Sequence, residues 1–106
     1  MNNKTIKVKM IANEMEALSG AYDMAIAAFN AETEHEELLC SLAVIMRQRL
    51  GLMLDKGQHQ YTLHFPEVES MAFAQLWVLF KNQLDLYENA VVQKILKHIH
   101  RDFIRA

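Results

Sequence analysis

The sequence predicts a mainly helical α+β domain with about four helices and a short two-stranded antiparallel ribbon. Two short segments alternate apolar and polar residues, whereas most of the remaining chain repeats apolar residues every three to four positions. Three glycines and one proline are too few for an all-β chain with many turns. At 106 residues and 12.3 kDa, the chain 1–106 fits one domain around one core.

Residues 4–10 and 59–65 are the expected strands. The apolar members of their alternation are Ile6, Val8, Met10, Tyr61, Leu63 and Phe65. This period of two is typical of a strand with one buried face. Because a two-stranded ribbon is marginal on its own, we expect the strands to pair with each other on a helical layer.

Two helices are expected between the strands. Over residues 11–30 the apolar positions recur at helical spacing, and they are Ile11, Met15, Leu18, Tyr22, Ile26 and Phe29. Thr33 followed by Glu36 fits a capping box, which predicts a helix over 34–54 that ends near Gly57. The short connection near Glu32 makes these two helices antiparallel neighbours.

The third and fourth helices follow the second strand. Pro66 suits a first helical position, and the helix after it is apolar on nearly every side from Val68 to Phe80. Asp85 is a candidate cap for a fourth helix, whose apolar stripe is Val92, Ile95, Leu96, Ile99 and Phe103. The alternative is one continuous helix over 67–104, because the polar segment 81–83 is a weak break.

The residues needed for catalysis, cofactor binding or metal binding are not evident. His98 and His100 point in different directions on a helix and cannot share an ion. Cys40 lies among leucines, without the nearby positive charge that activates a thiol. Three glycines leave no phosphate-binding loop and no dinucleotide fingerprint. We therefore expect no catalytic, cofactor-binding or metal-binding residues, and a protein that is not an enzyme.

Residues 20–29 resemble the second helix of a tetratricopeptide repeat, with Gly20, Tyr22, Ala25 and Phe29 at the matching positions. The resemblance covers ten residues, without the upstream Trp and Leu-Gly pattern or a following repeat. Small residues at this spacing let any two helices pack closely, so the match implies no shared function.

The composition favours a cytoplasmic protein that does not associate with membranes. A single cysteine excludes an internal disulfide framework and favours a reducing compartment. The first residues lack the apolar run of a signal peptide. The densest apolar run, residues 71–80, is roughly half the length that crosses a bilayer.

Protein interaction is the leading functional expectation. A helix that is apolar all round is either buried centrally or covered by a partner, and a small domain has little core to cover it. We expect a non-enzymatic interaction or adaptor protein that forms a homodimer, with Trp77 and Phe80 in the contact. The alternative is a monomer in which the ribbon and the other helices cover every side.

A basic stripe near the C-terminus is the second candidate binding surface. Lys94, Lys97, Arg101 and Arg105 follow one another at spacings of three, four and four. This stripe suits an acidic protein partner or, as the alternative function, an accessory regulatory factor that contacts nucleic acid. The net charge of −2 argues against nucleic acid, and the helix dipole favours cations in a last turn without any partner.

A structural ion pair is expected between the first two helices. Glu14 and Arg49 both fall within the apolar stripes of their helices. Glu14 lies 18 residues before Glu32 and Arg49 lies 17 residues after it, which places both at one height of an antiparallel hairpin. Because a lone buried charge is costly, the two side chains should pair. In the alternative, the aliphatic part of the Arg49 side chain covers the apolar stripe and its guanidinium lies in water.

Overall fold

A computed structural model describes residues 4–104 and confirms the mainly helical α+β class, with four α-helices and one two-stranded antiparallel sheet in that part of the chain. The elements are β1 (Thr5–Ile11), α1 (Ala12–Ala28), α2 (Glu34–Leu54), β2 (Gln60–Pro66), α3 (Glu67–Phe80) and α4 (Leu86–Ile99). A 3₁₀ turn, Lys81–Gln83, precedes α4, and a π-helical turn, His100–Ile104, follows it. Helices α3 and α4 are therefore separate.

The sheet has the expected pairing and the expected buried face. Val8 lies opposite Leu63 and Ile6 opposite Phe65, and both strands alternate exposed and buried residues along their whole length. Each strand begins and ends one residue later than predicted. Pro66 is the last residue of β2 and the N-cap of α3. It therefore precedes the first helical position, which the sequence predicts it to occupy.

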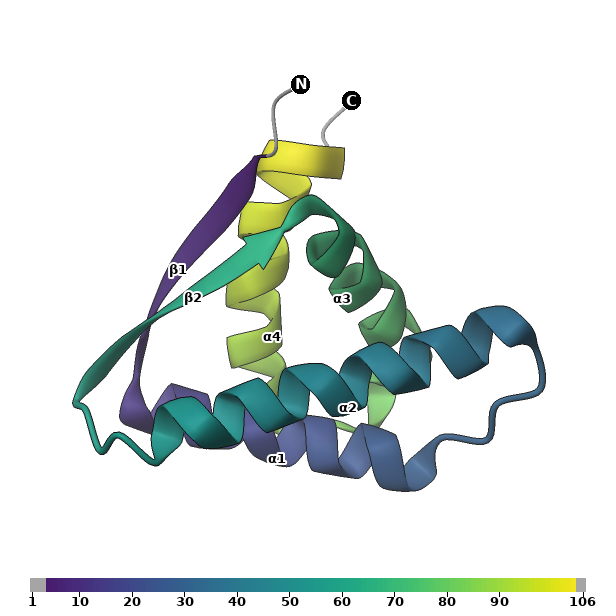
Figure 1. Cartoon of the computed structure of the whole chain (residues 1–106), viewed down its shortest axis with the longest axis horizontal. Helices are drawn as coiled ribbons and strands as arrows, with labels where there is room; N and C mark the ends of the chain where they lie inside the picture. The colour runs from purple at the N-terminus through teal and green to yellow at the C-terminus, as the bar shows by residue number, and fades with distance from the viewer. Residues whose placement is uncertain (1–3, 105–106) are drawn as a thin grey trace.

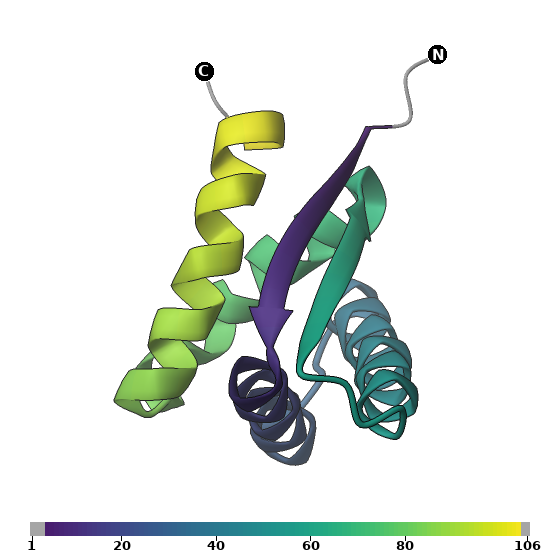
Figure 2. The same ribbon diagram turned by 90° about the vertical axis from the view of Figure 1, so that its left-hand side faces the viewer.

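The helices surround the inner face of the ribbon. Helices α1 and α2 form an antiparallel hairpin, and the ribbon rises from one end of it while α3 and α4 lie above its middle (Figure 1). Viewed from the side, α4 runs beside β1, whereas β2 lies on the side of the ribbon nearer to α2 (Figure 2). The inner side chains of all six elements meet in one core.

Three aromatic rings lie at the centre of that core. Trp77 and Phe73 from α3 meet Tyr22 from α1, with centroid distances of 5.5 Å for Tyr22–Trp77 and 5.8 Å for Phe73–Trp77. The rings meet edge to face, the arrangement that aromatic quadrupoles favour. The inner side of α3 is thus packed into the chain's own core.

The helix starts follow the expected chemistry. Thr33 caps α2 by accepting a hydrogen bond from the Glu36 N–H at 3.1 Å. Asp85 accepts from the Glu88 N–H at 2.7 Å, and the Glu88 carboxylate accepts from the Asp85 N–H at 3.0 Å. This reciprocal capping box starts a new helix after the 3₁₀ turn, which explains why the chain does not continue as one helix from α3.

Candidate functional site

The outer side of α3 is apolar, but its residues are not the ones that the sequence pointed to. Trp77 and Phe80 are 1% and 7% exposed and belong to the chain's own core, so the expectation that they form a subunit contact is wrong. The side chains that α3 turns outward are instead Val68, Met71, Val78 and Leu79. The reason is geometric: an all-apolar helix gives no sequence signal for which of its sides faces inward.

Helix α2 carries a second exposed apolar stripe. Leu38, Ile45 and Leu52 are all exposed, and their spacing of seven residues places them along one side of the helix. Arg49 lies within one turn of both Ile45 and Leu52 and forms an ion pair with Glu69 of α3. The stripe therefore lies on the exposed side of α2, beside the one of its residues that reaches Glu69 of α3.

Two of the exposed α3 side chains lie at the junction with α2. Val78 and Leu79 line a groove there, together with Gln75 of α3 and with Glu32, Thr33, His35, Glu36 and Leu39 at and before the start of α2. We call the seven exposed apolar side chains of the two helices the α2–α3 apolar face. Its members are Leu38, Ile45, Leu52, Val68, Met71, Val78 and Leu79.

The predicted basic stripe is only partly available for a partner. Lys94 Nζ lies 3.0 Å from both carboxylate oxygens of Glu14, and Arg101 Nε lies 3.0 Å from Asp102. The hydrogen bond from Arg101 lowers the pKa of the Asp102 carboxyl below its usual value, so this carboxylate stays charged beside the stripe. Lys97 is exposed, and Arg105 lies outside the described residues.

These side chains nevertheless share one surface. Lys94, Lys97 and Arg101 line a shallow hollow on α4 together with Ala90, Gln93 and His98. The spacing therefore correctly places the three described cations of the stripe on one side of the helix. The carboxylates that neutralise Lys94 and Arg101 in part could not be foreseen from spacing alone.

The expected Glu14–Arg49 ion pair does not form, because each side chain has another partner. The α1–α2 hairpin exists, but Arg47 rather than Arg49 faces α1, where its Nε lies 2.7 Å from Asp23. Residues two apart on a helix point about 200° apart, so Arg49 faces α3 and pairs with Glu69. Glu14 turns to Lys94 of α4.

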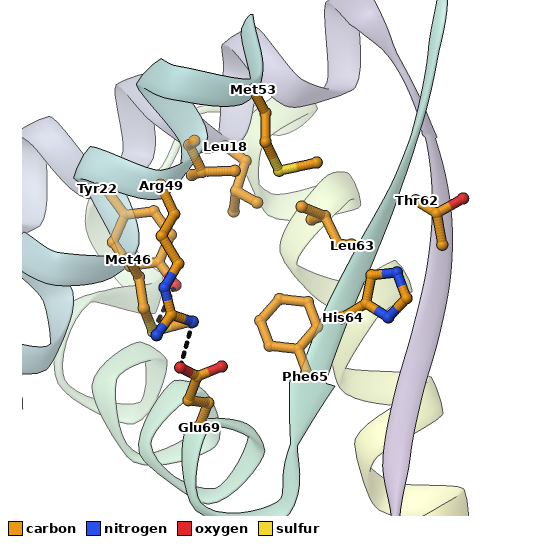
Figure 3. Close-up of a pocket in the computed structure, with 11 residues that line it drawn as sticks. Leu18, Tyr22, Met46, Arg49, Met53, Thr62, Leu63, His64, Phe65 and Glu69 are labelled. Carbon is orange, nitrogen blue, oxygen red and sulfur yellow. Dashed lines mark hydrogen bonds and ion pairs between the residues drawn. The ribbon is translucent and has the colours of Figure 1, made fainter.

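An apolar cavity lies between α1, α2, β2 and the start of α3. Its volume is about 190 Å³. Leu63 and Phe65 of β2 point into it, Leu18, Met46 and Met53 face them from the helices, and Thr62 and His64 point away (Figure 3). The remaining lining residues are Tyr22, Arg49, Leu50 and Glu69. No local pattern in the sequence predicts this cavity, since residues from four elements form it.

Polar atoms are present at the edge of this cavity. Glu69 Oε1 binds Arg49, whereas Glu69 Oε2 is buried and has no hydrogen-bond partner among the described residues. The Tyr22 hydroxyl is buried and donates only to the Met46 sulfur, at 3.5 Å. Burial, and secondarily the charge of Glu69, raise the pKa of the Tyr22 hydroxyl far above its ordinary value. The tyrosine is therefore neutral across the physiological range.

Within residues 4–104, no cluster of three or more His, Cys, Asp or Glu side chains is arranged to hold a metal ion. In the same part of the chain, no helix combines the length and the apolar character that a membrane span requires. Comparison with protein-family models, with curated proteins and with solved structures finds no match to this chain.

Proposed function

We propose that this chain is a non-enzymatic interaction protein that associates with a second copy of itself through the α2–α3 apolar face. The observation that carries the proposal is the distribution of exposed large apolar side chains. Of the ten in residues 4–104, seven belong to α2 and α3. Scattered apolar residues are normal on a protein surface, whereas a concentration of them on one side is typical of an interface.

A second copy is the occupant that suits the apolar character of this face. The ion pair between Arg49 and Glu69 is neutral as a unit, and the negative charge of Glu32 and Glu36 lies at one end of the groove. An apolar face is complementary to itself, and a two-fold contact uses the same surface on both copies. Two helices per protomer then pack into a four-helix contact.

The alternative function, nucleic-acid contact through α4, has less support. Two of the three described cations of the basic stripe, Lys94 and Arg101, are bound to carboxylates of the same chain. Binding to a phosphate backbone by counterion release needs cations that are free to replace salt. An acidic protein partner faces the same competition, so Lys97 would have to supply most of the attraction.

Single charged substitutions on the two helices test the proposed function. We expect Ile45→Glu and Val78→Glu each to weaken self-association at least tenfold, on the order of 1.4 kcal/mol or more, because a lone carboxylate is costly to bury in an apolar contact. Leu86→Glu is the matched control: Leu86 is apolar and 91% exposed, but it belongs to α4 rather than to the α2–α3 apolar face. Sedimentation velocity measures the association.

The substituted side chains are exposed in one copy, so all three variants should unfold at the same urea concentration as the wild type when it is diluted to one copy. At higher concentration the wild type and Leu86→Glu should gain stability by association, and the two face variants should not. Loss of association in the Leu86→Glu variant alone, or an unchanged dimer in both face variants, contradicts the proposed use of the α2–α3 apolar face.

A further inference from the structure

The apolar cavity beneath β2 is large enough to hold a small ring compound. Its volume is about 190 Å³, and it is partly open to solvent. For comparison, a closed protein cavity of about 150 Å³ lined by apolar side chains binds benzene. Aliphatic side chains and the Phe65 ring form most of its wall. The cavity therefore favours a molecule with one or two rings and excludes one with many polar groups.

One atom of the wall defines the polar chemistry of that molecule. Glu69 Oε2 is buried and has no partner among the described residues. An acceptor left in this state is destabilising. The atom has almost no surface open to the cavity, so a ligand that donates an N–H or O–H recovers the lost hydrogen bond once the Glu69 carboxylate turns towards it. Because Arg49 already balances the carboxylate charge, a neutral donor is favoured over an ammonium ion.

We propose that this cavity is a binding site for a small neutral ring compound that carries one N–H or O–H donor. The ring lies against Leu63 and Phe65, and the donor binds Glu69 Oε2. Arg49 holds the carboxylate in place through its other oxygen, which makes Arg49 a positioning residue. The site lies on the inner side of β2 and shares the Arg49–Glu69 pair with the edge of the α2–α3 apolar face, but it does not depend on the proposed self-association.

Methionine methyl groups report directly on the cavity. The full chain, with ¹³C-labelled methionine methyl groups, is titrated with indole, and the methyl signals are followed by NMR. Met46 and Met53 line the cavity, whereas Met71 is on the outside of α3 and Met24 is not part of the cavity wall. We expect saturable shifts of the Met46 and Met53 signals, without comparable shifts of the Met71 and Met24 signals.

Indene tests the assigned donor, because it has the shape of indole without the N–H. We expect indene to bind at least about tenfold more weakly, as one hydrogen bond to a buried carboxylate is lost. In the variant Glu69→Leu this difference between indole and indene should disappear. Arg49 is 56% exposed and stays solvated without its partner, so this variant is expected to fold.

Met53→Trp fills the cavity from its edge and should abolish the indole shifts at Met46. Met71→Trp is the matched control on the outer side of α3 and should leave them unchanged. No saturable shift with indole, or equal shifts at Met71, overturns the site. Equal affinities for indole and indene in the wild type overturn the role of Glu69. Far-UV circular dichroism verifies that each variant is folded.

Discussion

Lys94 of α4 reaches Glu14 at the beginning of α1 and lies 3.0 Å from both carboxylate oxygens. The same carboxylate accepts a hydrogen bond from the Ile11 N–H at 2.9 Å, where β1 passes into α1. One acidic side chain therefore caps a helix and joins it to another helix 80 residues away in the sequence. The position of Glu14 within an apolar stripe correctly predicts that its charge needs a partner. The expected partner was on the neighbouring helix α2, whereas the actual partner is on α4.

Removing either member of this pair should destabilise the chain unequally. Glu14→Ala removes both the cap and the ion pair and should lower the free energy of unfolding by about 1–2 kcal/mol. Lys94→Met removes the ion pair alone and should cost less than about 1 kcal/mol, because the pair is only partly buried. Urea unfolding of both single variants and the double variant measures the coupling. Equal costs for the two single variants would show that Glu14 has no capping role.

Tyr22 makes the stability of the chain sensitive to alkaline pH. Its pKa is raised in the folded chain, mainly by burial and then by Glu69, so folding favours the protonated hydroxyl. This contribution is fully present below the ordinary tyrosine pKa of about 10 and is lost as the pH rises above it. We expect the free energy of unfolding to fall by up to about 1.4 kcal/mol per pH unit there.

Tyr22→Phe should remove that part of the alkaline dependence while changing stability little at pH 7, because the hydroxyl has only a weak sulfur acceptor. Tyr61→Phe is the control: the Tyr61 hydroxyl accepts from the Gln58 N–H at 2.9 Å, so its loss should destabilise the chain at neutral pH. An unchanged alkaline transition in Tyr22→Phe would contradict the role of Tyr22.

At the scale of the elements, local signals were sufficient for type and approximate position. The alternation around Val8 and Leu63 predicts both the strands and the face that they bury, and Asp85 with Glu88 predicts the start of α4. These features depend on residues within a few positions of one another. The side of α3 that faces inward does not depend on such local signals. Trp77 and Val78 are adjacent and both apolar, and only packing against the rest of the core distinguishes them.

The capping box of α4 should contribute measurably to stability. Asp85→Ala removes the acceptor of the Glu88 N–H and should lower the free energy of unfolding by about 1 kcal/mol. Asp85→Ser retains an oxygen at the cap and should recover most of that loss. Urea unfolding measures both variants. A serine variant as unstable as the alanine variant would contradict the capping explanation.

At the scale of the whole molecule, the chain builds one core and leaves apolar side chains exposed on two neighbouring helices, α2 and α3. The cavity and the α2–α3 apolar face both depend on how α2 lies against α3 and β2, which are contacts between distant parts of the sequence. The apolar pattern of the third helix correctly predicts that apolar surface remains on it. The residues expected there, Trp77 and Phe80, are buried, and the exposed ones are instead Val68, Met71, Val78 and Leu79.

Sedimentation equilibrium of the wild-type chain tests the central claim, self-association through the α2–α3 apolar face, most directly. One copy has a mass of 12.3 kDa. The proposal predicts that the mass measured at tens of micromolar approaches twice this value and falls to the mass of one copy on dilution. Ile45→Glu should need an at least tenfold higher concentration to reach the same mass. A wild-type mass of one copy across the whole concentration range would contradict the claim.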